Sequence, residues 1–483
     1  MPESDPETTQ AGVPRSVAPA DGVLIRAENG DVVTFDETGL TLRLSDRVLA
    51  DLRKRLALPE AVPAHLIGDI DAWNLRREGD WLRFTARIEA GRPPRDYCKP
   101  VAGGDIIADT IGPLQAIFSI GGARRAGFND GPPGFAYHIL APGDHLGAVG
   151  YEGTFEARPV SGLQRMAHSP RDALIAEALL QMRYEAMQSQ PLIVARTETD
   201  ASASLAELNG GQAYVNFVTA LDSLVLAAAA LGKRAQVLAV GIDLSLEDEK
   251  SDATSRIMAL RRLMQKIEAD MAARGLYRPI FLISAESGTH SDGHHPAILA
   301  HSELGWSHAP HRFSAPAPGY MFEQTRYARP TASARIRMAE MDAHAIAALN
   351  ARKDWYCPQI LLAEHEGKMI RVICRAMSGL VIDDRFKAGD ACGFALHMKG
   401  KAPKITNVAI DPDDPQSLIL TLSAAIKTPA HLAYAYGAAA PSPDLYPANR
   451  GSLRDRWTAS SRAGDSLHRW ALSAFVPCHP GGL

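Results

Sequence analysis

The order of hydrophobic and polar residues changes twice along the chain, and the first part has a period of two. From Gly22 to Leu44 apolar and polar residues alternate, and the pairs Asn29-Gly30 and Thr38-Gly39 interrupt the alternation. The segment Trp81 to Ile88 repeats the alternation. Strands joined by tight turns show this pattern. We therefore expect a disordered or extended arm over 1–20 and a β-rich N-terminal attachment module over 21–112.

From about Pro113 short apolar runs alternate with segments in which apolar residues recur every three or four positions. The runs are Leu114 to Ile120, Leu192 to Ala195, Val237 to Ile242 and Ile280 to Ser284, and the helical segments are Asp172 to Gln188, Tyr214 to Gly232 and Thr254 to Arg274. Strands that alternate with helices predict a parallel sheet covered on both faces, with functional loops at the carboxyl ends of its strands. We assign this α/β domain to 113–357.

The pattern changes again near Pro358. Alternating segments separated by Gly, Pro and Asp predict strands at Lys368 to Cys374, Leu380 to Asp383, Ala391 to Met398, Ile405 to Ile410 and Ser417 to Leu422. These favour a β-sandwich over 358–432. The remaining 433–483 is expected to be a return segment that closes the α/β domain, followed by a tail. The sequence thus predicts a multidomain chain.

Composition excludes several classes of protein. The 483 residues carry a net charge of −4, and their Lys and Arg residues are spread along the sequence, which disfavours nucleic-acid binding. Five scattered cysteines fit folding in a reducing cytosol. The N-terminal 20 residues lack the apolar core of a secretory signal, and the apolar stretch from Leu224 to Leu231 is too short to cross a bilayer. We expect no membrane insertion.

Four stretches resemble the SGNH-hydrolase superfamily, in the sialate-O-acetylesterase-like branch found in phage, prophage and gene-transfer-agent structural proteins. They are AIFSIGGARRAG (116–127); SLAELNGGQAYVNF (204–217) with GKRAQVLAVGIDLSLED (232–248); the segment 295–322 with AEMDAH (339–344); and the segment 434–456, which contains YPANRGSLRDR. The resemblance implies a flavodoxin-like, three-layer parallel sheet, and it implies an ester-hydrolysing ancestry.

The chemical positions of these motifs have changed. The family's first turn resembles G-Q-S-x-x-x-G, whereas this chain has Ala123 in the place of the serine nucleophile. The block that resembles Q-G-E-x-D retains Glu247 but has lost its amide and its glycine, and the final D-x-x-H block contains Asp342 only two residues before His344. Since a methyl group cannot attack an ester, Glu247, Asp342 and His344 are read as vestigial candidates, and no catalytic residue is assigned.

Several polar residues have competing interpretations. Ser119 is either a displaced nucleophile or a packing residue in a strand, and the acidic run at 247–249 is either an acid/base pair or charge that complements a helix dipole. Arg124 and Arg125 either bind an anion such as a sugar carboxylate or are surface charges. With these two arginines, Asn129 and Asp248 complete the candidate carbohydrate- or anion-binding residues.

Two further groups of residues could bind ligands. Six histidines fall within 22 residues, namely His290, His294, His295, His301, His308 and His311. Their spacing matches no regular ligand pattern, so we predict neither a metal nor a cofactor. Five aromatic residues are candidates for stacking on sugar rings, although aromatic residues of this kind usually belong to the core: Trp306, Tyr320, Tyr327, Trp355 and Tyr356.

The function that these observations favour is a non-catalytic SGNH-like spike or fibre protein of a phage- or gene-transfer-agent-like particle that binds cell-surface polysaccharide. Its expected partners are other particle proteins and copies of itself. We expect it to be made in the cytoplasm and released by lysis on an assembled particle. The alternatives are an active carbohydrate O-acetylesterase with a displaced nucleophile and a protein-binding scaffold.

Overall fold

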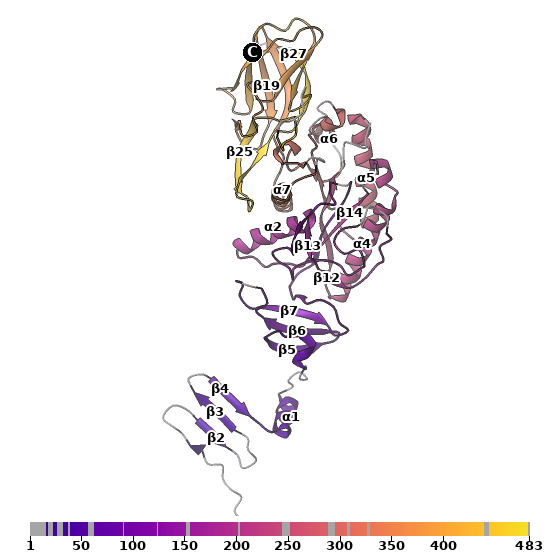
Figure 1. Cartoon of the computed structure of the whole chain (residues 1–483), viewed down its shortest axis with the longest axis vertical. Coiled ribbons are helices and arrows are strands. Elements are labelled where there is room, and N and C mark those ends of the chain that lie inside the picture. Colours follow the sequence, from indigo (N-terminus) through magenta and orange to yellow (C-terminus); the bar gives the residue numbers. More distant parts are fainter. Residues whose placement is uncertain are drawn as a thin grey trace, which may run out of the picture. The chain divides into compact units, whose positions relative to one another are not determined.

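A computed structural model of the chain divides into two compact units, an N-terminal unit (Met1–Gly103) and a C-terminal unit (Gly104–Leu483). The structure describes residues 16–17, 23–26, 32–36, 39–56, 62–89, 91–122, 124–150, 155–200, 203–243, 252–287, 295–306, 310–325, 329–438 and 444–481. Figure 1 shows the elements of both units. The arm expected over 1–20 lies outside these residues except for 16–17.

The N-terminal unit is built mainly from antiparallel strands. Its elements are β1 (Ser16–Val17), β2 (Val23–Arg26), β3 (Val32–Asp36), β4 (Gly39–Arg43), α1 (Asp46–Arg55), the 3-10 turn η1 (Ala64–Ile67), β5 (Ala72–Glu78), β6 (Trp81–Ala86) and β7 (Arg95–Pro100). Strands β1 to β4 pair in chain order, and so do β5 to β7. Leu82, Phe84 and Tyr97 are buried, as the alternation in β6 predicts. Helix α1 was not predicted.

The C-terminal unit contains a seven-stranded sheet with the order β12-β11-β14-β9-β15-β16-β17. All neighbouring pairs in this sheet are parallel except β11 with β12. The strands are β9 (Leu114–Gly121), β11 (Ile139–Pro142), β12 (Leu163–Arg165), β14 (Ile193–Thr199), β15 (Ala235–Asp243), β16 (Ile280–Ile283) and β17 (Phe313–Ser314). Strand β9 comes first in the chain but lies between β14 and β15. The chain order therefore reverses at its carboxyl end, where open parallel sheets commonly bind ligands.

Helices cover this parallel sheet. They are α2 (Arg171–Glu185), α4 (Gln212–Ala230), α5 (Ala253–Ala272) and α7 (Ala332–Asn350), with the shorter α3 (Leu205–Leu208), α6 (Ala300–Trp306), η2 (Pro296–Leu299) and η3 (Gly319–Met321). Figure 1 shows α2 and α7 on one side of the strands and α4 and α5 on the other. Helix α4 is long and apolar enough to cross a membrane, but 61% of its most apolar window is buried inside the protein. Most of its apolar residues therefore belong to the core, although Val215 and Leu226 are exposed.

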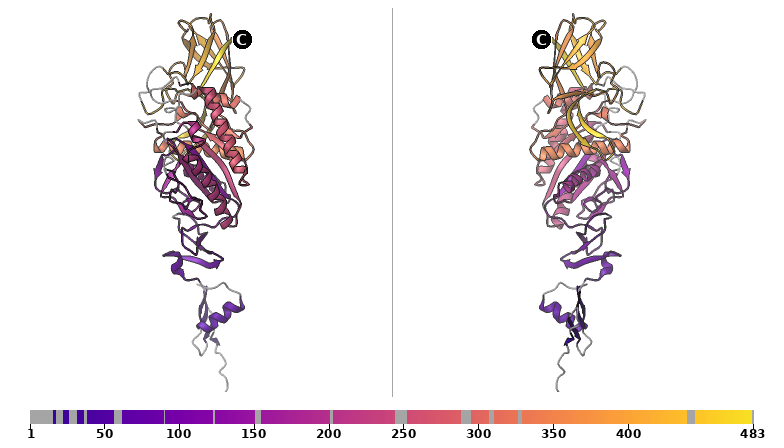
Figure 2. Two further views of the ribbon diagram at one scale, coloured as in Figure 1. Left: turned by 90° about the vertical axis from the view of Figure 1, so that its right-hand side faces the viewer. Right: turned by 90° about the vertical axis from the view of Figure 1, so that its left-hand side faces the viewer.

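A C-terminal β region follows α7. Its strands are β18 (Gln359–Glu366), β19 (Met369–Arg375), β20 (Leu380–Ile382), β21 (Phe394–Met398), β22 (Ile405–Ile410), β23 (Ser417–Leu422), β24 (Ala430–Tyr434), β25 (Leu453–Ser460), β26 (Ser466–Trp470) and β27 (Ala474–Pro480). Seven of them form a sheet in the order β21-β24-β27-β18-β19-β23-β22, and β20, β25 and β26 form a second, smaller sheet. Figure 2 shows these orange and yellow strands gathered apart from the purple strands of the parallel sheet. Short strands β8 (Ile107–Ala108), β10 (Phe128–Asp130) and β13 (His168–Pro170) complete the unit.

The structure shows a β-rich chain of several sheets with few helices. In the segment 433–483, β27 pairs with β24 and β18 inside the C-terminal β region, while Arg462 forms ion pairs with Glu177 of α2 and Glu340 of α7. The domain boundaries expected from the sequence, including a return segment that closes the α/β domain, stay a prediction. Helix α7 was not predicted, because its apolar face is interrupted by Arg337, Glu340 and Asp342, which are all buried. Helical periodicity cannot be recognised when the buried positions carry charges.

Candidate functional site

The candidate site lies at the carboxyl edge of the parallel sheet, where the loop after β9 begins. Ala123, which the resemblance to SGNH hydrolases sets in the place of a nucleophile, lies outside the described residues. Arg124 and Arg125 follow it directly, Asp243 ends β15, and Glu286 stands three residues beyond β16. The carboxyl ends of parallel strands meet at one edge, so the fold brings these charged groups together.

Arg125 is buried in the interior rather than displayed on a loop. Its side chain is 2% exposed, and its guanidinium lies 2.5 Å from the Asp172 carboxylate at the start of α2. Ser119 also points to this carboxylate: its hydroxyl is 2.5 Å from Asp172 Oδ2 and accepts a 3.0 Å hydrogen bond from Arg125 Nε. Thr197 donates to the same carboxylate oxygen. Ser119 is therefore a partner in a closed polar cluster, in agreement with the packing interpretation.

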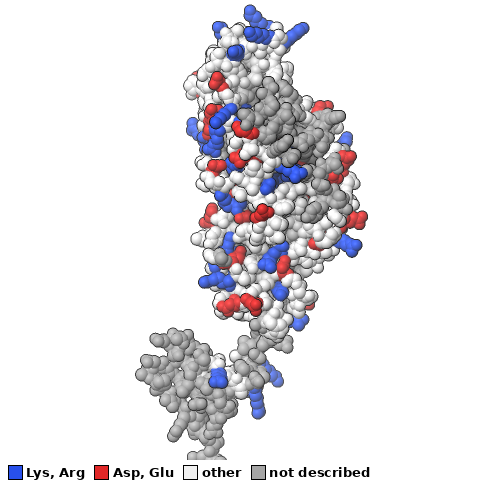
Figure 3. Space-filling model, viewed as in Figure 1, with Lys and Arg blue, Asp and Glu red and all other residues white. Residues whose placement is uncertain are grey.

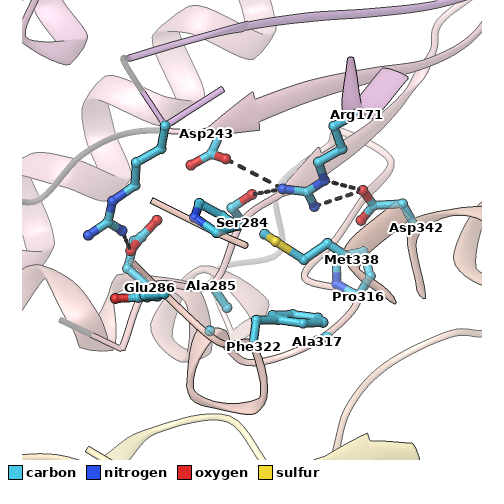
Figure 4. Close-up of a pocket in the computed structure, with 14 residues that line it drawn as sticks. Arg171, Asp243, Ser284, Ala285, Glu286, Pro316, Ala317, Phe322, Met338 and Asp342 are labelled. Atoms are coloured by element: carbon cyan, nitrogen blue, oxygen red, sulfur yellow. Dashed lines mark hydrogen bonds and ion pairs between the residues drawn. The ribbon is translucent and has the colours of Figure 1, made fainter. Parts of the chain in front are cut away.

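Arg171 forms the centre of a second buried cluster, shown in Figure 4. Its Nε and NH2 atoms lie 2.8 and 2.7 Å from Asp342 Oδ2, and its NH1 atom lies 3.4 Å from Asp243 Oδ2. The same NH1 donates to Ser284 Oγ at 3.1 Å. Arg171 begins α2 and Asp342 belongs to α7, so the ion pair ties these two helices together above the sheet.

Arg124 pairs with Glu286 across the same edge, and both side chains are less than a tenth exposed. Between this pair and Arg171 lies a cavity of about 30 Å³ that is also lined by Phe322 and Met338. A cavity of this volume holds one or two water molecules. The site is therefore too small for a sugar ring.

Burial sets the protonation behaviour of these carboxyl groups. It raises the pKa of Asp342, against the opposing effect of Arg171, and it raises the pKa of Glu286, against the opposing effect of Arg124. For Arg125 burial alone would lower the pKa, but the neighbouring carboxylates of Asp172, Asp243 and Asp342 outweigh it and raise the pKa overall. Arg125 thus remains a cation that holds the Asp172 carboxylate.

His344 lies on the other side of α7 from Asp342. Two residues along a helix correspond to a rotation of about 200°, so the two side chains diverge. His344 is stacked on Trp355, with ring centres 6.0 Å apart and planes at 6°, and its edge meets Trp457 at 5.0 Å. Burial lowers the pKa of His344. Asp342 and His344 therefore do not form a catalytic pair.

The other predicted binding residues have structural partners or lie outside the description. Asn129 donates to the Ala332 carbonyl and accepts from Arg335 Nε at 2.8 Å, so it holds the start of α7. Arg124 and Arg125 are not exposed anion-binding or surface charges, because Glu286 and Asp172 occupy them. Glu247 and Asp248 lie outside the described residues.

The histidine-rich stretch is dispersed by the fold. His290, His294 and His308 lie outside the described residues. His295 caps η2, His301 is buried in α6, and His311 pairs with Glu268 at 3.1 Å. Among the residues that the structure describes, no group of three His, Cys, Asp or Glu side chains could hold a metal ion.

Of the aromatic candidates for sugar stacking, two are core residues. Tyr320 is fully buried and donates to the Ala471 carbonyl at 2.7 Å, and Trp355 is 7% exposed. Tyr356 is half-buried beside Arg375. The Trp306 side chain and Tyr327 lie outside the description.

The sequence interpretation did not identify Arg171, Asp172 and Asp243 as site residues. Asp243 could have been found, because it directly follows the apolar run of a predicted strand, where parallel sheets place functional side chains. Arg171 and Asp172 gave no comparable signal. They begin an amphipathic helix, where charged residues usually face solvent.

Comparisons with known proteins leave the family open. No protein-family model matches the chain, and no curated protein matches it. Among solved structures, the chain is similar to XAC1771, described as a novel carbohydrate acetylesterase from Xanthomonas citri, at 11% identity and a TM-score of 0.46, over 95% of this chain and 94% of that one. It is also similar to the surface-layer protein SbsC, domains 1–6, at 14% identity and a TM-score of 0.17, over 32% of this chain and 18% of that one.

The buried ion pairs predict a large stability cost when Arg171 is removed. We expect Arg171→Ala to lower the free energy of unfolding by about 3–5 kcal/mol, because it leaves Asp342 and Asp243 buried without their cation. Urea unfolding followed by tryptophan fluorescence measures this. The control is Arg278→Ala, which removes a surface arginine paired with Glu268 and should cost about 0–1 kcal/mol. Equal costs for the two variants would contradict the assignment.

His301 predicts a loss of stability on acidification. Burial, with help from Arg256, lowers the pKa of His301 to about 3, while the Ile298 carbonyl opposes the shift. Between pH 6.5 and about 3 the unfolded chain binds a proton here that the folded chain does not, so stability falls by up to about 1.4 kcal/mol per pH unit.

We expect His301→Gln, which cannot titrate, to flatten this slope relative to the unmodified chain. Urea midpoints between pH 7 and pH 4.5 measure the difference, and the comparison cancels the contribution of carboxyl groups common to both proteins. If the two proteins lost stability equally per pH unit, His301 would bind as many protons in the folded state as in the unfolded state, and the expectation would be wrong.

Proposed function

We propose that the chain is a non-catalytic, SGNH-like protein that binds acidic polysaccharide at a cell surface. The observation that carries the non-catalytic part is the pairing at the carboxyl edge of the parallel sheet. There the arginines and carboxylates engage one another and leave a cavity of about 30 Å³. The motifs that resemble SGNH hydrolases support the ancestry, including the three-layer parallel sheet.

Ester hydrolysis needs a nucleophile within hydrogen-bond reach of its base. The sequence places alanine at position 123, and His344 packs between Trp355 and Trp457. Ser119, the alternative nucleophile, is fully buried and hydrogen-bonded to Asp172. A substrate would have to displace buried ion pairs to reach it. These contacts weigh against the alternative of a displaced-nucleophile esterase.

Support for polysaccharide binding comes from one end of the C-terminal β region, which we call the lysine tip. Three loops meet there, because the Leu422 amide donates to the Lys368 carbonyl and the Ser423 amide donates to the Lys404 carbonyl. The lysine tip consists of five exposed lysines: Lys368, Lys399, Lys401, Lys404 and Lys427. Figure 3 shows blue side chains gathered at the top of this region, whereas blue and red are mixed over the rest of the visible face.

The lysine tip lacks compensating charge. Among the described residues, none of the five lysines has an ion pair, and the three loops contain one acidic residue at this end, Glu366. Many arginines of the unit, by contrast, have carboxylate partners. A compact excess of positive charge attracts a polyanion and releases its counterions on binding. An acidic surface polysaccharide satisfies this requirement.

The biological setting remains part of the proposal. A protein that binds surface polysaccharide without cleaving it fits a spike or fibre of a phage- or gene-transfer-agent-like particle. In that setting the N-terminal unit attaches to other particle proteins, the subunits form a homo-oligomer, and the C-terminal unit contacts the cell. The protein is then made in the cytoplasm and leaves the cell by lysis on the particle. A protein-binding scaffold is the remaining alternative.

The closed cleft predicts no esterase activity. We expect hydrolysis of p-nitrophenyl acetate and of O-acetylated sugars at the rate of buffer alone, because Ser119, the hydroxyl that lies beside the Asp172 carboxylate, is fully buried and the cavity at this edge is only about 30 Å³. Spectrophotometric assay with the unmodified chain tests this. If turnover occurs and His344→Ala or Ser119→Ala abolishes it, the chain is an enzyme and the non-catalytic proposal fails.

The lysine tip predicts salt-sensitive binding to polyanions. We expect polygalacturonic acid, but not neutral dextran, to bind, with affinity that falls as salt rises from 50 to 300 mM. The triple variant Lys399→Gln, Lys401→Gln, Lys404→Gln should weaken binding at least tenfold at 50 mM salt. Biolayer interferometry measures both effects.

The matched control removes three exposed cations elsewhere in the C-terminal unit, with Arg262→Gln, Arg278→Gln and Lys353→Gln. It makes the same change in net charge and should leave affinity within twofold. Equal losses in the two triple variants would mean that total charge, not the lysine tip, governs binding. If the chain bound double-stranded DNA more tightly than the polysaccharide, the ligand assigned to the lysine tip would be a nucleic acid and not a glycan.

A further inference from the structure

A second cavity, of about 200 Å³, lies beside the edge strand β17 of the parallel sheet, away from the closed cleft. It is bounded by the connection from α7 to β18, by the end of β19, and by α6. Its polar lining consists of Ser314, Asp354, Tyr356, Gln359 and Arg375, and His301 and Cys357 form part of its wall. It is several times larger than the cavity beside Arg171, so it has room for a group of water molecules or for one sugar ring.

Three polar side chains that line this cavity lack a hydrogen-bonding or charged partner among the described residues. Within the described residues, Asp354 has no ion pair and no hydrogen bond, and neither has the amide of Gln359. Arg375 has no carboxylate partner, although it lines the same cavity as Asp354. An acid and a base that share a cavity without pairing leave space for a ligand between them. This contrasts with the closed cleft, where every arginine holds a carboxylate.

The remaining contacts fix the shape of the cavity. The Arg375 guanidinium lies over the Tyr356 ring, 4.1 Å from its centre, which restricts the direction of its N–H groups. Trp355 beneath is buried between His344 and Trp457, and Ser314 Oγ is 3.3 Å from the Trp355 carbonyl. These contacts fix the aromatic part of the wall, whereas Asp354 and Arg375 are exposed at its rim.

The charges of the lining identify the class of ligand. The charges of Asp354 and Arg375 sum to zero. His301 is uncharged at neutral pH, because burial lowers its pKa to about 3. A carboxylate accepts hydrogen bonds from hydroxyls, a guanidinium donates to them, and an amide does both. The wall atoms are divided between polar and apolar, as the two faces of a pyranose require.

We propose that this cavity binds one neutral sugar residue of the surface polysaccharide, with Asp354, Gln359 and Arg375 holding its hydroxyl groups. The proposal rests on the polysaccharide binding proposed above and adds a recognition site to it. The lysine tip supplies attraction to any polyanion, whereas this cavity selects the sugar through its hydroxyl pattern.

The test uses the whole chain and four soluble probes: the methyl glycosides of glucose, galactose, mannose and N-acetylglucosamine. We expect at least one to give a saturation-transfer NMR signal and a millimolar dissociation constant. Asp354→Asn and Arg375→Gln should each weaken that binding at least tenfold while leaving the circular dichroism spectrum unchanged. The matched control, Asp390→Asn with Lys387→Gln, alters an exposed acid and base of the same β region and should have no effect.

The outcomes separate this inference from the proposed function. Polygalacturonic acid binding to the lysine tip is measured in parallel. If polygalacturonic acid binds but no glycoside does, or if glycoside binding resists both cavity variants, the cavity assignment is wrong and the proposed function stands. If neither the polymer nor any glycoside binds, both fail. Binding of the zwitterion alanine in place of every glycoside, lost in Asp354→Asn, would make the cavity an amino-acid site and overturn the sugar assignment.

Discussion

The constraint on which the C-terminal unit depends is that charges removed from water need partners. The carboxyl edge of the parallel sheet buries three arginines and four carboxylates within a few strands of one another. An isolated buried ion costs several kcal/mol, and each of these ions is compensated by a neighbour of opposite charge. The edge therefore tolerates neither a free nucleophile nor an open pocket without losing that compensation.

This network also determines how the unit is assembled. Asp342 on one side of α7 meets Arg171 of α2, while Glu340, two residues earlier, accepts hydrogen bonds from Ser461 Oγ at 2.6 Å and from the Arg462 amide at 2.9 Å. Helix α7 thus joins the parallel sheet to the C-terminal β region through polar contacts on both of its faces. Polar contacts between specific partners define one register, which apolar packing alone specifies less strictly.

The sequence was sufficient to predict the elements whose burial follows a simple period. The runs at Leu114, Val237 and Ile280 became parallel strands, because apolar residues buried on both faces are recognisable without knowledge of neighbours. Helix α7 could not be predicted from the sequence pattern, because several of its buried positions carry charged residues. Partners of these residues, such as Arg171 and Arg462, lie more than a hundred residues away in the chain. The resemblance to SGNH hydrolases could single out Ala123 from the sequence, but the ion pairs at the edge of the parallel sheet could not be predicted, since they depend on Arg171 and Asp342 meeting in space.

A parallel sheet whose switch point is closed can still support binding, provided that the binding groups lie where water already reaches them. Within the described part of the chain, the lysine tip and the cavity beside β17 are two places where charged side chains lack an ion pair, and both lie at or near the C-terminal β region. An exposed lysine without an ion pair costs little free energy, because water solvates its charge. Asp354 and Arg375 also remain in contact with solvent, so neither group needs the oppositely charged partners that the buried ions of the cleft have. Because charge without a partner is tolerated mainly at the surface, the binding proposed for this unit depends on exposed groups, whereas its buried charges hold the helices together.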